Sequence, residues 1–167
     1  EGKRGRTREA FYPALFEELG FPYTGSDAYA LTLTLDKSLS KRLVAGFGVP
    51  SPRGRFVTRE ALAAGVLDDV IFPAIVKPNF EGSSKGITQE SVVEERGRLR
   101  ALVEKQLGRF PAGVLVEEFI PGKDLTVAFL EKAAPERGGV LTPVEYVIDD
   151  AELSKRREAW VKELETR

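Results

Sequence analysis

The chain has 167 residues, of which 42% are hydrophobic and 31% are charged, and its 25 basic and 26 acidic side chains leave a formal net charge of -1. This length can bury the core of one domain or of two small lobes, and so balanced a charge favours neither nucleic acid nor a membrane as partner. No apolar run approaches the roughly 20 residues that span a bilayer, so we expect a cytoplasmic protein.

Cysteine, histidine and methionine are absent from the chain. The missing cysteine and histidine exclude disulfides, thiolate nucleophiles, Ser-His-Asp and Cys-His catalysis, and the usual zinc sites. Because the chain begins with Glu1 and contains no methionine, we expect a piece of a longer protein.

The first part of the chain has helical periodicity. Phe11, Leu15 and Leu19 stand four apart and predict a short amphipathic helix over 8–19, and FPYTG after it reads as a brief strand leading into a turn. Residues 27–47 predict further helix, broken near Asp36, whose side chain can cap a second helical segment. The prolines of GVPSPRG then end the helix.

The middle of the chain alternates between strands and helices. The pattern predicts strands over 55–57, 74–77 and 114–119, and helices over 58–67 and 94–107. This alternation predicts an α+β lobe. Two more strands are expected over 125–130 and 140–148, joined by a Gly-rich turn, and a helix over 151–166.

Lys77 ends the apolar strand and is followed by a loop of small residues, EGSSKG, over 81–86. A lysine is costly to bury without an anion, but at the end of a strand it can present its charge to a ligand. Backbone N–H groups and hydroxyls in such a loop suit phosphate oxygens. The alternative is an ordinary surface turn, because Gly/Ser stretches are common in turns.

Several motifs in unbroken order support the phosphate interpretation. The series PYTGS, LDK, GVP, VKP with EGSSKGI, and VLVEEFIPGKDLTV is similar to the D-alanine:D-alanine ligase group of the ATP-grasp superfamily, over about residues 7–130. The resemblance implies an α+β ATP-grasp fold. Residues 1–30 would end an N-terminal lobe, 31–122 would form the small central ATP-binding lobe, and 123–167 would start the C-terminal lobe.

The resemblance also implies roles for individual residues, each transferred to a matching position. Lys37 and Lys77 match the lysines that hold the ATP phosphates, where clustered cations stabilise a transferring phosphoryl group. Glu9 matches an acidic residue that faces the first amino-acid substrate. Glu81, Gly82, Ser83 and Ser84 match the loop that closes over the phosphates, and Ser83 matches the residue that orders this loop. Glu117 matches the carboxylate that accepts from the adenine amino group, and Glu118, Phe119 and Ile120 match the segment that lines the adenine edge. Asp124 matches the carboxylate that binds the ribose.

The activity implied is ATP-dependent ligation of two amino acids through an acyl phosphate, as in peptidoglycan synthesis. Mg²⁺ would bridge the phosphates, with ligands expected outside this chain, because no acid with a following Glu-x-Asn comes after Leu130. Lys85 stands where the dipeptide ligases commonly have an aliphatic residue, which leaves the amino acids open. A homodimer is also left open. The alternatives are a non-catalytic ATP-binding or regulatory module and a carboxylase-type ATP-grasp lobe.

Overall fold

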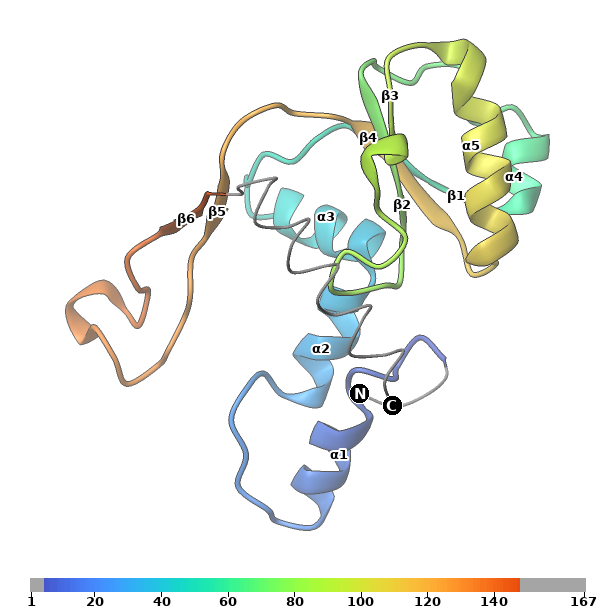
Figure 1. The fold of residues 1–167 in the computed structure, drawn as a ribbon. Helices are drawn as coiled ribbons and strands as arrows, with labels where there is room; N and C mark the ends of the chain where they lie inside the picture. The colour runs from blue at the N-terminus through green and yellow to red at the C-terminus, as the bar shows by residue number, and fades with distance from the viewer. Residues whose placement is uncertain (1–4, 148–167) are drawn as a thin grey trace, which may run out of the picture. The chain divides into compact units, whose positions relative to one another are not determined.

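The computed structural model describes residues 5–147, which divide into two compact units, one ending at Ile120 and the other beginning at Pro121 (Figure 1). No helix in this described part is long and apolar enough to cross a membrane. The elements of the first unit are α1 (Phe11–Glu18), α2 (Ala28–Leu35), α3 (Lys37–Ala45), β1 (Gly54–Val57), α4 (Arg59–Ala63), β2 (Ala74–Pro78), η1 (Gln89–Ser91), β3 (Val92–Val93), α5 (Arg96–Arg109) and β4 (Val114–Glu118).

An antiparallel sheet of four strands, in the order β1-β4-β2-β3, forms the centre of the first unit. Strand β4 pairs with β2 so that Lys77 lies opposite Leu115 and Ile75 lies opposite Glu117. Figure 1 shows α4 and α5 on one side of the sheet and α3 on the other. The α+β class predicted from the alternating pattern is confirmed.

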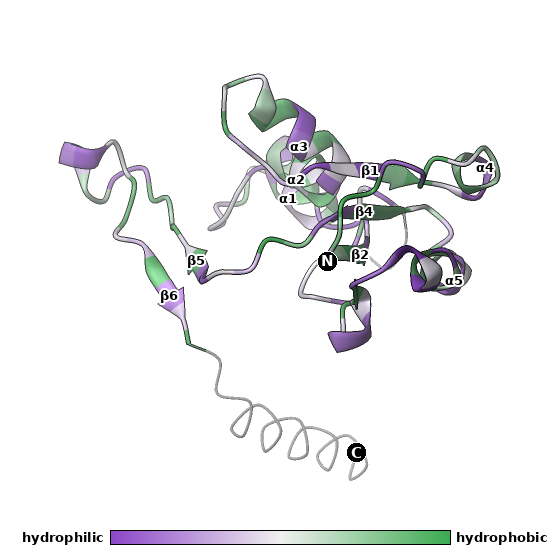
Figure 2. Ribbon diagram, turned by 90° about the horizontal axis from the view of Figure 1, so that it is seen from above, coloured by the Kyte–Doolittle hydropathy of each residue, from purple (hydrophilic) through white to green (hydrophobic). Residues whose placement is uncertain are grey.

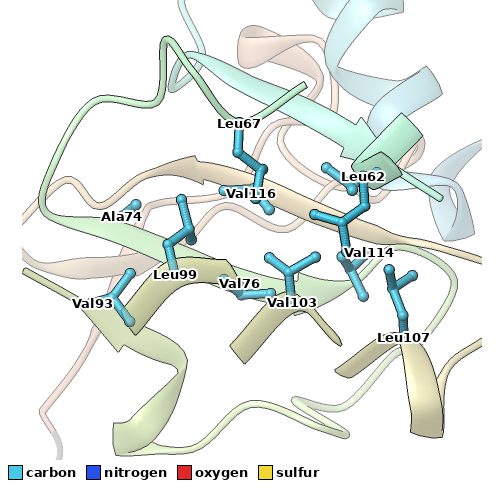
Figure 3. Close-up of a cluster of buried hydrophobic side chains, with 11 residues drawn as sticks. Leu62, Leu67, Ala74, Val76, Val93, Leu99, Val103, Leu107, Val114 and Val116 are labelled. Atoms are coloured by element: carbon cyan, nitrogen blue, oxygen red, sulfur yellow. The ribbon is translucent and has the colours of Figure 1, made fainter. Parts of the chain in front are cut away.

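The hydrophobic core lies between the sheet and α5 (Figure 3). Leu99, Val103 and Leu107 recur at helical spacing along α5 and are at most 1% exposed. They pack against buried strand residues and against Leu62 of α4 and Leu67 after it. The strand residues of this cluster are Val57, Ala74, Val76, Val93, Val114 and Val116. The remaining residues of α5 are largely charged, so its ribbon carries both hydrophobic and hydrophilic residues (Figure 2). The core therefore forms where the apolar residues that recur every 3.6 positions in the helix meet those that recur every 2 positions in the strands.

The three N-terminal helices follow the predicted pattern with one exception. Asp27 caps α2 by accepting from Ala30 N, and Asp36 caps α3 by accepting from Leu39 N, as a helical break at Asp36 requires. The strand expected over FPYTG is wrong, because residues 21–25 form no strand. Tyr23 instead donates its hydroxyl to Glu17, which raises the pKa of Tyr23 to about 12, and this contact holds the turn against α1.

The second unit contains a two-stranded antiparallel sheet formed by β5 (Asp124–Thr126) and β6 (Val144–Tyr146), with the short helix η2 (Pro135–Arg137) between them. Phe129 and Val140 add an isolated bridge, so the two strands expected here do pair, over shorter lengths than the alternation suggested. The helix expected over 151–166 lies outside the described residues.

Candidate functional site

Lys77 and Glu117 share the face of the sheet that looks away from the hydrophobic core. Alternate residues of a strand point to opposite faces, and Val76 and Val116 point into the core. Lys77 and Glu117 therefore face the other way, on neighbouring strands, where Lys77 Nζ pairs with Glu117 Oε1. Glu117 is only 5% exposed. A carboxylate so buried needs compensating charge, and Lys77 supplies part of it.

Lys41 supplies the rest of this charge from helix α3. Its ammonium pairs with the second oxygen of Glu117 and also donates to the carbonyl of Pro52. Lys41 is not among the residues that the sequence motifs predict, although it stands one helical turn after Lys37 and so lies on the same side of the helix. Gly54 allows the close packing here, because it is the register partner of Glu117 and a Cβ on it would lie 2.5 Å from Glu117 Cβ.

Lys37, the first residue of α3, reaches the loop that follows β2. Its ammonium donates to the carbonyl of Glu81. Burial lowers the pKa of Lys37, and the neighbouring cations Lys77 and Arg8 lower it further, against the opposing effect of Glu81 and Glu117. The two lysines expected to act together are thus near enough to repel each other, which is a favourable position for a multiply charged anion.

Arg8 of the N-terminal segment binds the beginning of the loop over residues 81–86. Arg8 donates through Nη2 to the carbonyl of Phe80 at 2.6 Å and to Glu81 Oε2 at 2.9 Å. Glu9 lies on the next stretch, and a Cβ on Gly82 would be 3.5 Å from Glu9 Oε1. The structure therefore brings Glu9 to the loop, as a substrate-facing role would require. Arg8 was not anticipated, and nothing in its local sequence spacing marks it.

The backbone of the loop turns through left-handed conformations. Ser83 and Ser84 have φ of 51° and 55°, and both side chains are exposed. Gly86 has φ of 78°, and a Cβ there would lie 2.6 Å from the ring of Phe110 and 2.7 Å from Pro78 Cγ. Only glycine fits this position, because the left-handed backbone and the close approach both exclude a side chain. The loop thus exposes its two serines to solvent, and its end at Gly86 is packed against Phe110 and Pro78.

The predicted adenine edge begins at Glu118, the last residue of β4, and continues through Phe119 and Ile120. Glu118 N donates to Arg53 O at 2.8 Å, and Phe119 N donates to Pro73 O at 2.7 Å, so a base would be read by other backbone atoms of this segment. Phe119 is 37% exposed and Ile120 is 60% exposed, so neither is a core residue of the first unit. Asp124 begins β5 in the second unit, where it is exposed and pairs with Tyr146.

Two clefts border the Glu117 carboxylate and its partners. One, of about 470 Å³, is lined by Glu117 and Glu118 of β4, by Arg53 and Gly54, and by residues 69–71. The other, of about 440 Å³, is lined by Ser38 and Lys41 of α3 and by residues of β1 and β4. Both volumes lie within the usual range of small-molecule sites. A small ligand in the first cleft would lie beside the buried Glu117 carboxylate, and one in the second would lie beside Lys41, which pairs with that carboxylate.

No three Asp or Glu side chains gather into a metal-binding group within residues 5–147. The Lys37 ammonium lies among two other cations, Arg8 and Lys77, and two carboxylates, Glu81 and Glu117. The chemistry that this cluster supports is therefore recognition of an anion by fixed cations and loop donors.

Comparison with protein families gives a match over residues 44–153, more than half of the chain, to the family described as D-ala D-ala ligase C-terminus. Among curated proteins, the D-alanine--D-alanine ligase of Haemophilus influenzae (strain PittEE) is 40% identical over 121 residues, which cover 70% of this chain and 39% of that protein. The D-alanine--D-alanine ligase of Ectopseudomonas mendocina (strain ymp) is 35% identical over 174 residues, covering 92% of this chain and 52% of that protein.

Solved structures give the same result for the fold. The D-alanine--D-alanine ligase of Bacillus anthracis complexed with ATP superposes with a TM-score of 0.65 and 27% identity, over 89% of this chain and 49% of that one. This neighbour supports the ATP-grasp fold expected from the sequence. The chain spans about half or less of the length of the relatives it matches.

Proposed function

The chain belongs to the D-ala D-ala ligase C-terminus family, and from this we propose that the protein is an ATP-dependent ligase that joins the carboxylate of one amino acid to the amine of another. The observation that carries the proposal is that Lys37 and Lys77 lie close to each other beside the Glu81 loop. Two neighbouring ammonium groups make the binding of a multiply charged anion more favourable. The proposal concerns the whole protein, of which this chain supplies the ATP-binding part.

In this proposal, Lys37 and Lys77 hold the ATP phosphates and the loop of Glu81, Gly82, Ser83 and Ser84 closes over them. Left-handed φ angles at the two serines support this, because such turns bring successive N–H groups into a concave nest for oxygen ligands.

Glu117 accepts from the adenine amino group. It lines a cleft large enough for a small ligand, which supports this assignment. The backbone over Glu118, Phe119 and Ile120 lines the adenine edge, and Asp124 binds the ribose. Glu9 lies at Gly82 and faces the first amino acid.

The reaction has two steps. A carboxylate oxygen of the first amino acid attacks the γ-phosphorus, the bond to the β,γ-bridging oxygen breaks, and ADP leaves with that electron pair. The amine of the second amino acid then attacks the acyl carbon, inorganic phosphate leaves, and the amine nitrogen loses a proton. Fixed cations and exclusion of water are what the protein contributes, because a solvated acyl phosphate would hydrolyse.

Mg²⁺ would neutralise phosphate charge in such a reaction. The described residues offer no cluster of carboxylates suited to it. We therefore derive no step through the metal, and the location of its ligands outside this chain stays a prediction.

The test is an assay of the full-length gene product for inorganic phosphate released from ATP with a panel of amino acids, D-alanine among them, with the dipeptide identified by mass spectrometry. Lys37→Ala and Lys77→Ala should each reduce turnover by about 100-fold or more, as expected when a charge on a transferring phosphoryl group is removed. Lys105→Ala is the matched control, because Lys105 lies on α5 and its exposed ammonium pairs with Glu90.

Full activity in either lysine variant would contradict the proposal. ATP binding without turnover on any amino acid would favour the alternative of a non-catalytic module. Bicarbonate-dependent turnover would favour a carboxylase-type lobe. Neither alternative is favoured by the comparisons, since the named relatives of the chain reported above are ligases.

A further inference from the structure

Asn79 is completely buried and uses both its backbone and its side chain to hold the start of helix α3. Its carbonyl accepts from Lys37 N at 3.2 Å, and its Oδ1 accepts from Ser38 N at 2.9 Å. Its Nδ2 donates to Asp36 Oδ1 at 2.7 Å, and its own N–H donates to Gly113 O at 3.2 Å. One residue at the end of β2 thus contacts three successive residues of another element.

These contacts replace a purely local helix cap. The first N–H groups of a helix have no partner within the helix, and a capping side chain normally satisfies one of them. Asp36 does so for Leu39 N at 3.0 Å, but the N–H groups of Lys37 and Ser38 are satisfied by Asn79. The beginning of α3 is therefore fixed to strand β2.

Asp36 closes the arrangement. Burial by itself raises the pKa of the Asp36 carboxyl, but hydrogen bonds from Asn79, Leu39 and Ser38 outweigh burial and lower it. The carboxylate is thus held in its charged form with several donors. An arrangement of this kind is rigid, because a buried polar group that loses a partner carries a desolvation cost.

Resting on the proposed function, we infer that Asp36 and Asn79 are positioning residues that set the place of Lys37 beside Lys77. Lys37 stands between them in sequence and space, since Asp36 precedes it and Asn79 binds its backbone. Lys77 lies on β2, two residues before Asn79, which directly follows the strand. Asp36 and Asn79 thereby fix the spacing between the two lysines before any nucleotide binds. Such preorganisation strengthens anion binding, because the lysines need not be ordered when the ligand arrives.

Two substitutions at Asp36 separate positioning from helix capping. Asp36→Ser keeps a good capping oxygen for Leu39 N, but its hydroxyl is too short to hold Asn79 as well. Asp36→Asn keeps an oxygen that can serve both donors. Asp27→Ser is the matched control, because Asp27 caps α2 in the same way through Ala30 N at 2.7 Å.

ATP affinity of the full-length protein, measured by equilibrium dialysis without amino acids, is the first readout. Asp36→Ser should weaken binding about tenfold, or about 1.4 kcal/mol, while Asp36→Asn and Asp27→Ser stay within about twofold. In a Lys37→Ala background, Asp36→Ser should weaken ATP binding by less than about twofold, since its effect on affinity depends on the Lys37 side chain. An equal loss in both backgrounds would overturn the inference.

The second readout needs no nucleotide. Competitive acylation of the Lys37 amine across pH, followed by mass spectrometry, reports its pKa among the groups that face it, Arg8, Lys77, Glu81 and Glu117. Asp36→Ser should raise that pKa toward the ordinary lysine value as the side chain moves to solvent, and an unchanged profile would overturn the inference. If the profile shifts but the parent protein binds no ATP, the proposed function fails while the positioning role stands.

Discussion

Lys77 and Glu117 form an ion pair across neighbouring strands, on the face of the sheet opposite the hydrophobic core. Lys41 occupies the second carboxylate oxygen. Glu117 therefore has two tasks in the proposed site: it compensates two lysines of the free protein, and it offers an acceptor to the base.

Glu117→Gln should lower the free energy of unfolding by about 1–3 kcal/mol, because it leaves two partly buried lysines without their counter-charge. Glu118→Gln is the control and should stay within about 0.5 kcal/mol, since an amide oxygen can still accept from Arg53 N. Urea unfolding measures both. Similar midpoints for the two variants would show that the ion pairs contribute no stability.

The same substitution tests the assignment of the base. Adenine carries an exocyclic amino group that can donate to Glu117, and hypoxanthine carries a carbonyl there. The parent protein should bind ATP more tightly than inosine triphosphate by about tenfold, the scale of one charge-assisted hydrogen bond, and Glu117→Gln should reduce that ratio. Competition binding with the two nucleotides measures it. Equal affinities in the parent would exclude a role for Glu117 in reading adenine.

Lys37 should make stability depend on pH in the alkaline range. Burial, with Lys77 next, lowers its pKa below the ordinary value of 10.5, so the unfolded chain binds more protons than the folded one between the two values. The contribution of Lys37 to the free energy of unfolding therefore rises with pH in that window and is least favourable below it.

Lys37→Met should remove this rise and be relatively more stable than the parent at neutral pH. Unfolding by urea at a series of pH values up to 10.5 measures the difference between the two proteins. A difference that stays constant across the window would mean that the ammonium is not desolvated in the folded state.

Gly86→Ala should destabilise the protein by more than about 1 kcal/mol, because the added Cβ meets the Phe110 ring on a backbone with φ of 78°. Gly97→Ala on α5 is the matched control. A Cβ on Gly97 meets nothing within 4 Å, so this change should stabilise the helix by about 0.5–1 kcal/mol. Thermal unfolding of the two variants checks the opposite signs, and a stabilising Gly86→Ala would contradict the loop geometry.

Leu99→Ala should cost about 2–5 kcal/mol of stability, because Leu99 is 1% exposed at the centre of the core between α5 and the sheet. Leu19→Ala removes the same atoms from a residue that is 55% exposed and should cost no more than about 0.5 kcal/mol. The midpoints of denaturant unfolding compare the two variants, provided that the free energy of unfolding depends equally steeply on denaturant concentration in both. Equal losses would place the core elsewhere.

Local patterns were enough for most of the secondary structure. The breaks at Asp36 and at the prolines of 50–52, the strand before Lys77 and the apolar spacing of α5 each follow from a residue and its near neighbours. The strand predicted over FPYTG did not form for a physical reason: its aromatic residues favour a strand, but Tyr23 is fixed by a hydrogen bond to Glu17 and the segment pairs with no strand.

The sequence by itself determined the family, the order of the motifs and the candidate lysines, because motif spacing and helical or strand period are properties of neighbouring residues. Only the tertiary structure decided which of these side chains meet. Register put Lys77 and Glu117 on one face, packing of α3 on the sheet added Lys41, and the loop brought Asn79 to Asp36. Each of these contacts joins residues more than 35 positions apart in the chain, and their pairing depends on the whole fold.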